Sequence, residues 1–118
     1  MNKREIGTFY EEAVNEYLKL QGINIIYKNF RCRFGEIDLI GWENDCLIFF
    51  EVKYRKDERY GYPVEAVTEM KKRTICKCAS YYCVKYDVKA PIRYDVIGVT
   101  GTEITWIKDA FTHRGYCF

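Results

Sequence analysis

Apolar residues recur every three or four positions at the start of the chain, which predicts an amphipathic helix over about residues 2–21. The apolar face of this helix consists of Ile6, Phe9, Tyr10, Ala13, Val14, Tyr17, Leu18 and Leu20. Gly22 is suited to end the helix. On the helical wheel Glu12 faces solvent, whereas Glu11 lies at the border of the apolar face, beside Leu18.

Five later segments are rich in β-branched and aromatic residues, which predicts strands. They are residues 23–31, 35–42, 47–53, 90–99 and 103–111. The sequence Glu43-Asn44-Asp45-Cys46 suits a tight turn between the second and third strands, and Thr100-Gly101-Thr102 joins the last two. A second helix is predicted from Pro63 to about Tyr86, on the spacing of Val64, Val67, Ile75, Ala79 and Tyr82.

The order of these elements is helix, three strands, helix and two strands, which is typical of an α/β or α+β domain. The first three strands can form an antiparallel meander, and the second helix is long enough to return the next strand in parallel. We therefore expect a mixed five-stranded sheet. At 118 residues, with no repeats or linker-like stretches, the whole chain (1–118) is expected to be one domain.

The composition is that of a soluble globular protein, at 48% hydrophobic and 31% charged residues. No apolar run approaches the ~18 residues of a membrane span, and the first residues lack the apolar core of a secretory signal. We therefore expect a cytoplasmic protein without membrane contact. Its six cysteines are then expected to be reduced and mostly buried. With one histidine and no C-x-x-C motif, a zinc site is poorly supported.

Charged residues interrupt the apolar pattern of the hairpin over residues 35–55. If Asn44-Asp45 is a two-residue loop, Glu43 faces Cys46, and the same register places Asp38 across from Glu51. Glu36, Asp38, Ile40 and Trp42 then share one face of their strand, opposite Ile37 and Leu39. Glu36 likewise falls across from Lys53. A slip of one residue would send Asp38 and Glu51 to opposite faces.

Two opposed carboxylates repel each other, so this arrangement needs a neutralising partner. Lys53 or Arg55 could provide it as a structural ion pair. A divalent cation is the alternative, because an all-oxygen site with water-filled positions suits Mg²⁺ or Mn²⁺. In that case Lys53 could stabilise charge on a phosphate or orient the attacking water. The residues alone leave both alternatives open.

Asp38, twelve intervening residues and Glu51-Val52-Lys53 resemble the D…(E/Q)-x-K signature of the restriction-endonuclease-like nucleases. The whole chain is similar to the bacterial YraN family of predicted endonucleases, which is related to archaeal Holliday-junction resolvases. The residues that carry this resemblance are Gly7, Glu11, Glu12, Ala13, Tyr17-Leu18, Asn29-Phe30-Arg31, Gly35-Glu36-Ile37-Asp38-Leu39-Ile40, Phe50-Glu51-Val52-Lys53, Arg55, Gly61, Glu65-Ala66-Val67, Lys71 and Asp95-Val96. Tyr10 departs from the glycine usual in the family.

The resemblance implies a restriction-endonuclease-like fold in which Asp38 and Glu51 bind the metal. It implies that Lys53 assists catalysis and that Glu11 approaches the same site from the first helix. Glu36 matches a motif position and is expected beside the metal or its ligands. Lys71 also matches, and we interpret it as a phosphate contact.

The sequence thus predicts a Mg²⁺- or Mn²⁺-dependent endonuclease that acts on DNA. Candidate contacts to the DNA backbone are Arg31, Arg33, Arg55, Lys71, Lys72 and Arg73. No motif for reading bases is visible, which favours structured or branched DNA, and a homodimer would suit a symmetric junction. The alternatives are a nucleic-acid-binding or adaptor protein that keeps the fold without catalysis, and a domain whose charged hairpin binds another protein.

Overall fold

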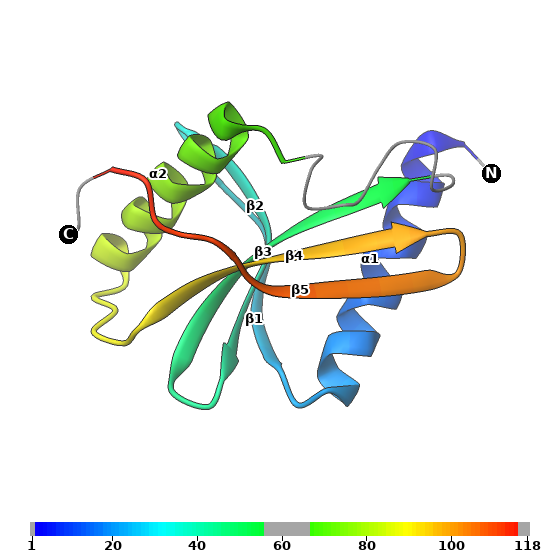
Figure 1. Cartoon of the computed structure of the whole chain (residues 1–118), viewed down its shortest axis with the longest axis horizontal. Helices are drawn as coiled ribbons and strands as arrows, with labels where there is room; N and C mark the ends of the chain where they lie inside the picture. The colour runs from blue at the N-terminus through cyan, green and yellow to red at the C-terminus, as the bar shows by residue number, and fades with distance from the viewer. Residues whose placement is uncertain (1, 56–66, 116–118) are drawn as a thin grey trace.

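The computed structural model describes residues 2–55 and 67–115 (Figure 1). Its elements are α1 (Lys3–Leu20), β1 (Asn24–Cys32), β2 (Gly35–Glu43), β3 (Cys46–Arg55), α2 (Glu69–Lys85), β4 (Ile92–Thr100) and β5 (Glu103–Phe111). This order confirms the predicted α-β-β-β-α-β-β arrangement. No helix in the described ranges is both long enough and apolar enough to span a bilayer.

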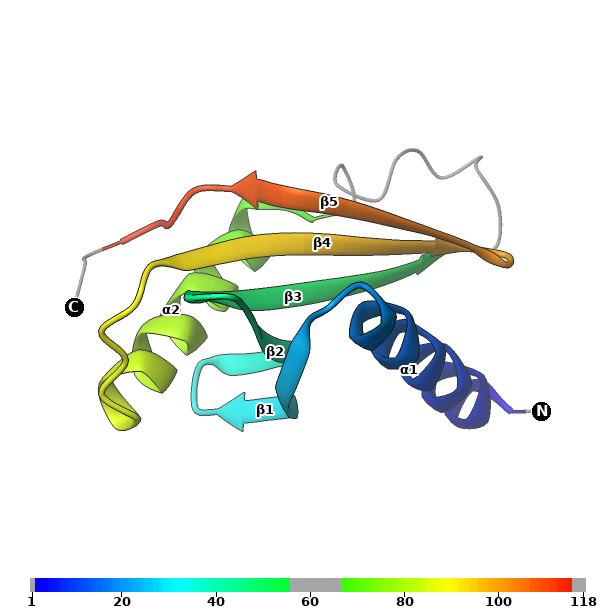
Figure 2. The same cartoon turned by 90° about the horizontal axis from the view of Figure 1, so that it is seen from below.

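The five strands form one mixed sheet in the order β1-β2-β3-β4-β5. β1, β2 and β3 are antiparallel neighbours, β3 and β4 are parallel, and β4 and β5 are antiparallel. α2 makes the crossover between the two parallel strands, as the spacing of the elements predicted. Figure 2 shows the strands stacked from β5 at one edge to β1 at the other, with strong twist.

Each face of the sheet carries its own apolar core. Under α2 lie Phe49, Tyr94 and Val96, packed against Ile75 and Tyr82 of the helix. Under α1 lie Ile48, Phe50, Ile97 and Val99, packed against Val14 and Leu18. The two helices therefore cover opposite faces of the sheet, and β3 and β4 contribute alternate residues to both cores.

The buried face of α1 is narrower than the sequence predicted. Val14 and Leu18 are fully buried, and Tyr10 and Tyr17 pack at the edge of the same core. By contrast, Phe9 and Leu20 were predicted to lie on this face and are exposed, Leu20 to 84%. A single helix that lies on a sheet buries one stripe, so the periodicity identified the helix but overestimated the width of its contact.

α2 begins later than predicted. Pro63 and Val64 lie outside the described residues, and the helix starts at Glu69, with the Thr68 side chain accepting a hydrogen bond from the Lys71 backbone N–H. Val67 is buried but precedes the cap, so its inclusion in the helix was wrong. The residues Lys71, Lys72 and Arg73, predicted near the middle of the helix, instead lie in its first two turns.

The cysteines of the described chain are free thiols, and Cys117 lies outside it. Cys76, Cys78 and Cys83 lie on the buried face of α2, and burial raises the pKa of Cys78 to about 12 and that of Cys83 to about 11. Cys32 is half-buried, with its Sγ atom 3.5 Å from that of Cys78. The expectation of buried cysteines is confirmed for Cys76, Cys78 and Cys83.

Candidate active site

The hairpin of β2 and β3 has the predicted register near its turn. Glu43 pairs with Cys46, and the pairing continues to Leu39 and Phe50. Asn44 supplies the left-handed backbone conformation of the loop, with φ of 53°. Asp38 and Glu51 occupy the next positions of the same register, immediately beyond the last pair of the ladder.

Asp38 lies where β2 separates from β3. One of its carboxylate oxygens, Oδ2, accepts a hydrogen bond of 2.7 Å from the backbone N–H of Val52. The regular alternation of side chains fails here, because Ile37 and Ile40 both pack under α2 while Leu39 packs under α1. The prediction that Ile37 and Leu39 share a face is therefore wrong. This break turns the Asp38 carboxylate toward the backbone of β3.

Burial is the main influence on the Asp38 carboxyl and raises its pKa. The Val52 hydrogen bond and the positive charge of Lys71 oppose this effect. The negative charges of Glu36 and Glu11 reinforce it. Asp38 thus lies within electrostatic reach of carboxylates from α1 and β2 and of a lysine from α2.

Glu51 is a buried carboxylate on β3, with 5% of its surface exposed. Its Oε1 atom lies 3.6 Å from Lys53 Nζ, and its Oε2 atom lies 3.9 Å from Lys71 Nζ. Burial, followed by the charge of Asp38, raises the pKa of Glu51 to about 7 although both lysines oppose the shift. Asp38 and Glu51 therefore lie close enough for the charge of one to affect the ionisation of the other.

Lys71 comes to this site from the first turn of α2, where its own backbone N–H is held by Thr68. Sequence reasoning interpreted Lys71 as a phosphate contact and missed its ion pair with Glu51. The signal that could have suggested the pair is Thr68, whose type favours a helix N-cap three residues before Lys71. That cap fixes where the helix begins and hence where Lys71 points.

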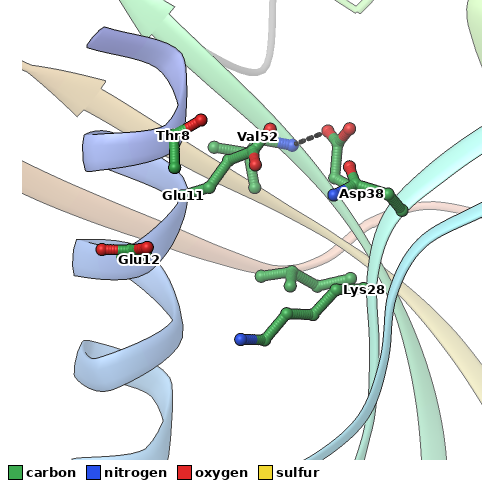
Figure 3. Close-up of a pocket in the computed structure, with 8 residues that line it drawn as sticks. Thr8, Glu11, Glu12, Lys28, Asp38 and Val52 are labelled. Atoms are coloured by element: carbon green, nitrogen blue, oxygen red, sulfur yellow. Dashed lines mark hydrogen bonds between the residues drawn. The ribbon is translucent and has the colours of Figure 1, made fainter. Parts of the chain in front are cut away.

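A pocket of about 140 Å³ adjoins Asp38 between α1 and the sheet (Figure 3). Its lining residues are Thr8, Glu11, Glu12, Lys28, Asn29, Asp38, Leu39 and Val52. Figure 3 shows Glu11 extending from α1 toward Val52 and Asp38, and Lys28 approaching from β1. Glu11 therefore lines the same pocket as Asp38. The Val14 and Leu18 stripe explains its position, because Glu11 is one turn before Val14 on the side that meets the sheet.

Tyr10, which departs from the family pattern, also belongs to this end of α1. Its ring stacks on that of Tyr54 at a centroid distance of 4.2 Å. Tyr54 follows Lys53 on β3, so the stacked rings join α1 to the strand that carries Glu51 and Lys53. Tyr10 therefore helps to fix the position of Glu11 relative to the site.

The remaining predicted residues are distributed around the site. Glu36 pairs with Arg31 of β1, with Arg31 Nε 3.3 Å from Glu36 Oε2. Its predicted position across from Lys53 lies beyond the β2–β3 ladder, which ends at Leu39 and Phe50. Arg33 lies at the turn between β1 and β2, with its guanidinium over the Phe34 ring. Arg55 ends β3, and its buried Nε has no hydrogen-bond partner in the described chain.

Lys72 and Arg73 do not join Glu51. The Lys72 ammonium lies over the ring of Phe111 at 5.7 Å, and Arg73 Nε lies 3.6 Å from Glu69 Oε1 on α2 itself. Of the three consecutive basic residues in the first turns of α2, therefore, only Lys71 contacts a residue of the candidate site.

The donor set of the site consists of carboxylates. Within residues 2–55 and 67–115, no group of three or more His, Cys, Asp or Glu side chains is arranged to hold a metal ion. Asp38 and Glu51 supply two carboxylates, of which Asp38 has one oxygen engaged by Val52. This set fits Mg²⁺, which is commonly held by one or two carboxylates together with water and substrate phosphates.

Comparison with known proteins places these residues in a family. The model of the family described as "Uncharacterised protein family UPF0102" matches residues 10–99, a range that includes Glu11, Asp38, Glu51 and Lys53. The chain belongs to the UPF0102 family. This membership confirms the resemblance drawn from the sequence motifs.

Curated relatives of UPF0102 match over nearly their full length. A UPF0102 protein of Legionella pneumophila (strain Corby) is 42% identical over 92% of this chain and 95% of its own length. One from Lachnoclostridium phytofermentans is 42% identical over 98% of this chain and 99% of its own. One from Fusobacterium nucleatum is 45% identical over 92% of both chains. The chain therefore covers at least 92% of the length of each of these relatives.

Proposed function

We propose that this UPF0102 protein is a metal-dependent endonuclease that hydrolyses phosphodiester bonds of DNA at Asp38 and Glu51. One observation carries the proposal. Glu51 is buried beside a second carboxylate and has only loosely placed lysines, so its pKa rises to about 7. Such an arrangement costs stability, which is typical of a site kept for chemistry.

A bound Mg²⁺ or Mn²⁺ would supply polarisation of a phosphoryl oxygen and a lowered pKa for the attacking water. Asp38 and Glu51 are the residues to hold it. The Val52 N–H fixes the orientation of the Asp38 carboxylate, and the buried position of Glu51 limits its rotamers. Glu11 is positioned to add a third carboxylate from α1 when substrate binds.

Lys53 is the residue best placed to act on the substrate. It is three-quarters buried, lies 3.6 Å from Glu51 and follows it by two positions on the same face of β3. Its ammonium group can donate hydrogen bonds to a phosphate oxygen and stabilise the charge that develops there. Lys71 offers a second positive charge on the other oxygen of Glu51. The polyanionic backbone of DNA matches this pair of cations.

The test is cleavage of linear, flap and four-way DNA by the purified protein, with Mg²⁺ or Mn²⁺ and with EDTA. We expect metal-dependent cleavage by the wild type, abolished in Asp38→Asn and lowered at least a hundredfold in Lys53→Ala. Asp45→Asn is the matched control, because it removes the same charge from the exposed turn of the same hairpin. Equal activity of wild type and Lys53→Ala would identify a contaminant, and an inactive wild type on all three substrates would refute the proposal.

A further inference from the structure

A second, larger hollow lies along one flank of α2. Its volume is about 490 Å³, and it is formed by α2 together with the turn between β1 and β2 and the segment after β5. Its apolar surface includes Phe34, Tyr81 and Val84. Its cations include Arg33, Lys77 and Lys85, and no acidic residue lines it within the described part of the chain. We call this hollow the α2 groove.

The aromatic rings of the α2 groove are fixed but remain accessible. Phe34 is 37% exposed and Tyr81 is 38% exposed, and their centroids lie 6.5 Å apart in an edge-to-face arrangement. Tyr81 also contacts the buried ring of Phe30, at 6.1 Å. Val84 beside them is 68% exposed. The groove thus presents flat apolar faces whose positions are set by the core beneath them.

The cations of the α2 groove differ from most others on the surface. Lys19, Lys89 and Lys108 each pair with a nearby carboxylate. Arg33, Lys77 and Lys85, by contrast, form no ion pair within the described residues. Arg33 stacks on Phe34 and Lys85 on Tyr86, which orients both charges over rings. Arg114 at the end of the groove is already held by Glu69, at 3.0 Å.

We infer that the α2 groove binds an unpaired strand of DNA, with bases stacked on Phe34 and Tyr81 and phosphates beside Arg33, Lys77 and Lys85. Exposed aromatic rings flanked by uncompensated cations are the features by which proteins hold single strands. In a duplex the faces of the bases are covered by their neighbours, so the rings would have no partner. An acidic ligand without flat rings would use the lysines but leave Phe34 and Tyr81 exposed.

The groove is joined to the candidate active site by the hairpin of β1 and β2. Lys28 and Asn29 of β1 line the pocket beside Asp38, and Arg33 at the turn of the same hairpin lines the groove. At about 3.3 Å per residue, the four steps from Asn29 to Arg33 span about 13 Å. In Figure 1 this hairpin lies beside α2.

Gly35 fixes the hairpin on the helix. Its φ is 146°, and a Cβ atom built there would come within 2.7 Å of Thr74 Cγ2 on α2. The hairpin backbone therefore sits directly against the helix, and the groove and the site keep a fixed separation. This inference rests on the proposed function. Given that function, the spacing between groove and site indicates a substrate class, namely DNA in which a duplex at Asp38 continues into an unpaired strand over α2.

The test is equilibrium binding of a fluorescein-labelled oligothymidylate, followed by anisotropy in EDTA so that no cleavage is needed. We expect tighter binding of the oligothymidylate than of its duplex with oligodeoxyadenylate. Tyr81→Leu should weaken single-strand binding on the order of tenfold. Lys77→Ala should weaken it less and reduce the slope of log K against log salt by about 0.7, the share of one phosphate. Lys19→Ala, on α1, is the control and should bind like the wild type.

The inference is overturned if the duplex binds as tightly as the single strand, or if both groove variants bind like Lys19→Ala. Preferential binding of an oligouridylate of the same length would overturn the assignment to DNA. Single-strand binding that depends on Tyr81 and Lys77, in a protein that cleaves no DNA with metal present, would support the groove and refute the nuclease. The two proposals can therefore fail separately.

Discussion

Asp95 and Glu51 are buried carboxylates on neighbouring parallel strands, and their surroundings differ sharply. Asp95 is completely buried and accepts four hydrogen bonds. The donors are Arg93 Nε and Nη2, each at 2.8 Å, Trp106 Nε1 at 2.8 Å and the backbone N–H of Asp109 at 2.9 Å. Glu51 has two lysine nitrogens at 3.6 and 3.9 Å and a second carboxylate nearby.

The difference separates an acid that has a full set of hydrogen-bond partners from one that lacks them. Arg93 binds both oxygens of Asp95 and also contacts Glu43, which lowers the pKa of Glu43 and raises its own. Each carboxylate oxygen of Asp95 accepts two hydrogen bonds, from donors on β4 and β5. The cluster therefore holds these two strands together. Glu51 lacks such partners, and its raised pKa records the energetic cost of ionising it.

The largest expected effect follows from breaking the satisfied cluster. Asp95→Asn replaces an acceptor of four hydrogen bonds with an amide and removes the charge that balances Arg93. We expect the free energy of unfolding, measured with urea, to fall by about 3–5 kcal/mol. Asp87→Asn is the control, since it makes the same change at an exposed residue and should alter stability by less than about 0.5 kcal/mol. A loss below 1 kcal/mol in Asp95→Asn would contradict the structural role.

The opposite sign is expected at Glu51. The folded pKa of about 7 lies above the ordinary value of 4.5, so the folded state resists ionisation and stability falls as pH rises from 4.5 to 7. Glu51→Gln removes this cost. In EDTA we expect the variant to unfold like the wild type near pH 4 and to be about 3 kcal/mol more stable at pH 8.

Urea unfolding across this pH range measures that difference. The gain should develop between pH 4.5 and 7 and remain constant above 8. A Glu51→Gln protein that is less stable than the wild type at pH 8 would show that Glu51 is a structural acid like Asp95. The same variant should also lose metal-dependent cleavage, which connects the stability gain to the proposed site.

The elements of the fold and the hairpin register could be predicted because they depend on local patterns. The two-residue turn and its register brought Asp38 next to Glu51 in the predicted pairing, and the resemblance identified the pair as a candidate site. Alternation failed at Ile37, because the separation of β2 from β3 is a tertiary feature that no spacing records. The four hydrogen bonds that Asp95 accepts were not predicted either, because the donors come from both β4 and β5 and no local pattern brings them together.

Helix boundaries and partners between elements were the least predictable features. Pro63 predicted the start of the second helix, but α2 starts after its N-cap residue Thr68. The position of this cap determines where Lys71 lies. Leu20 shows the same limit on α1, because periodicity places it on the apolar stripe and only docking on the sheet decides which part of that stripe is buried. The proximity of Asp38 and Glu51 could be predicted because both lie on the β2–β3 hairpin. The contact of Lys71 with Glu51 could not, because α2 brings Lys71 there.

The smallest expected effect tests whether the lysines near Glu51 are as loosely coupled as their distances indicate. Lys71→Met keeps the aliphatic stem and removes a charge 3.9 Å from Glu51 Oε2. The lost attraction should raise the pKa of Glu51 further and cost less than about 1 kcal/mol at pH 8. Near pH 4, where Glu51 is protonated in both proteins, the cost should shrink. In the Glu51→Gln background the cost of Lys71→Met should disappear, so a double-mutant cycle in EDTA measures the interaction energy between Lys71 and Glu51. A cost of 3 kcal/mol or more, comparable to that of the Arg93–Asp95 pair, would mean that Lys71 and Glu51 form a tight structural bridge, and the contrast between the two acids would fail.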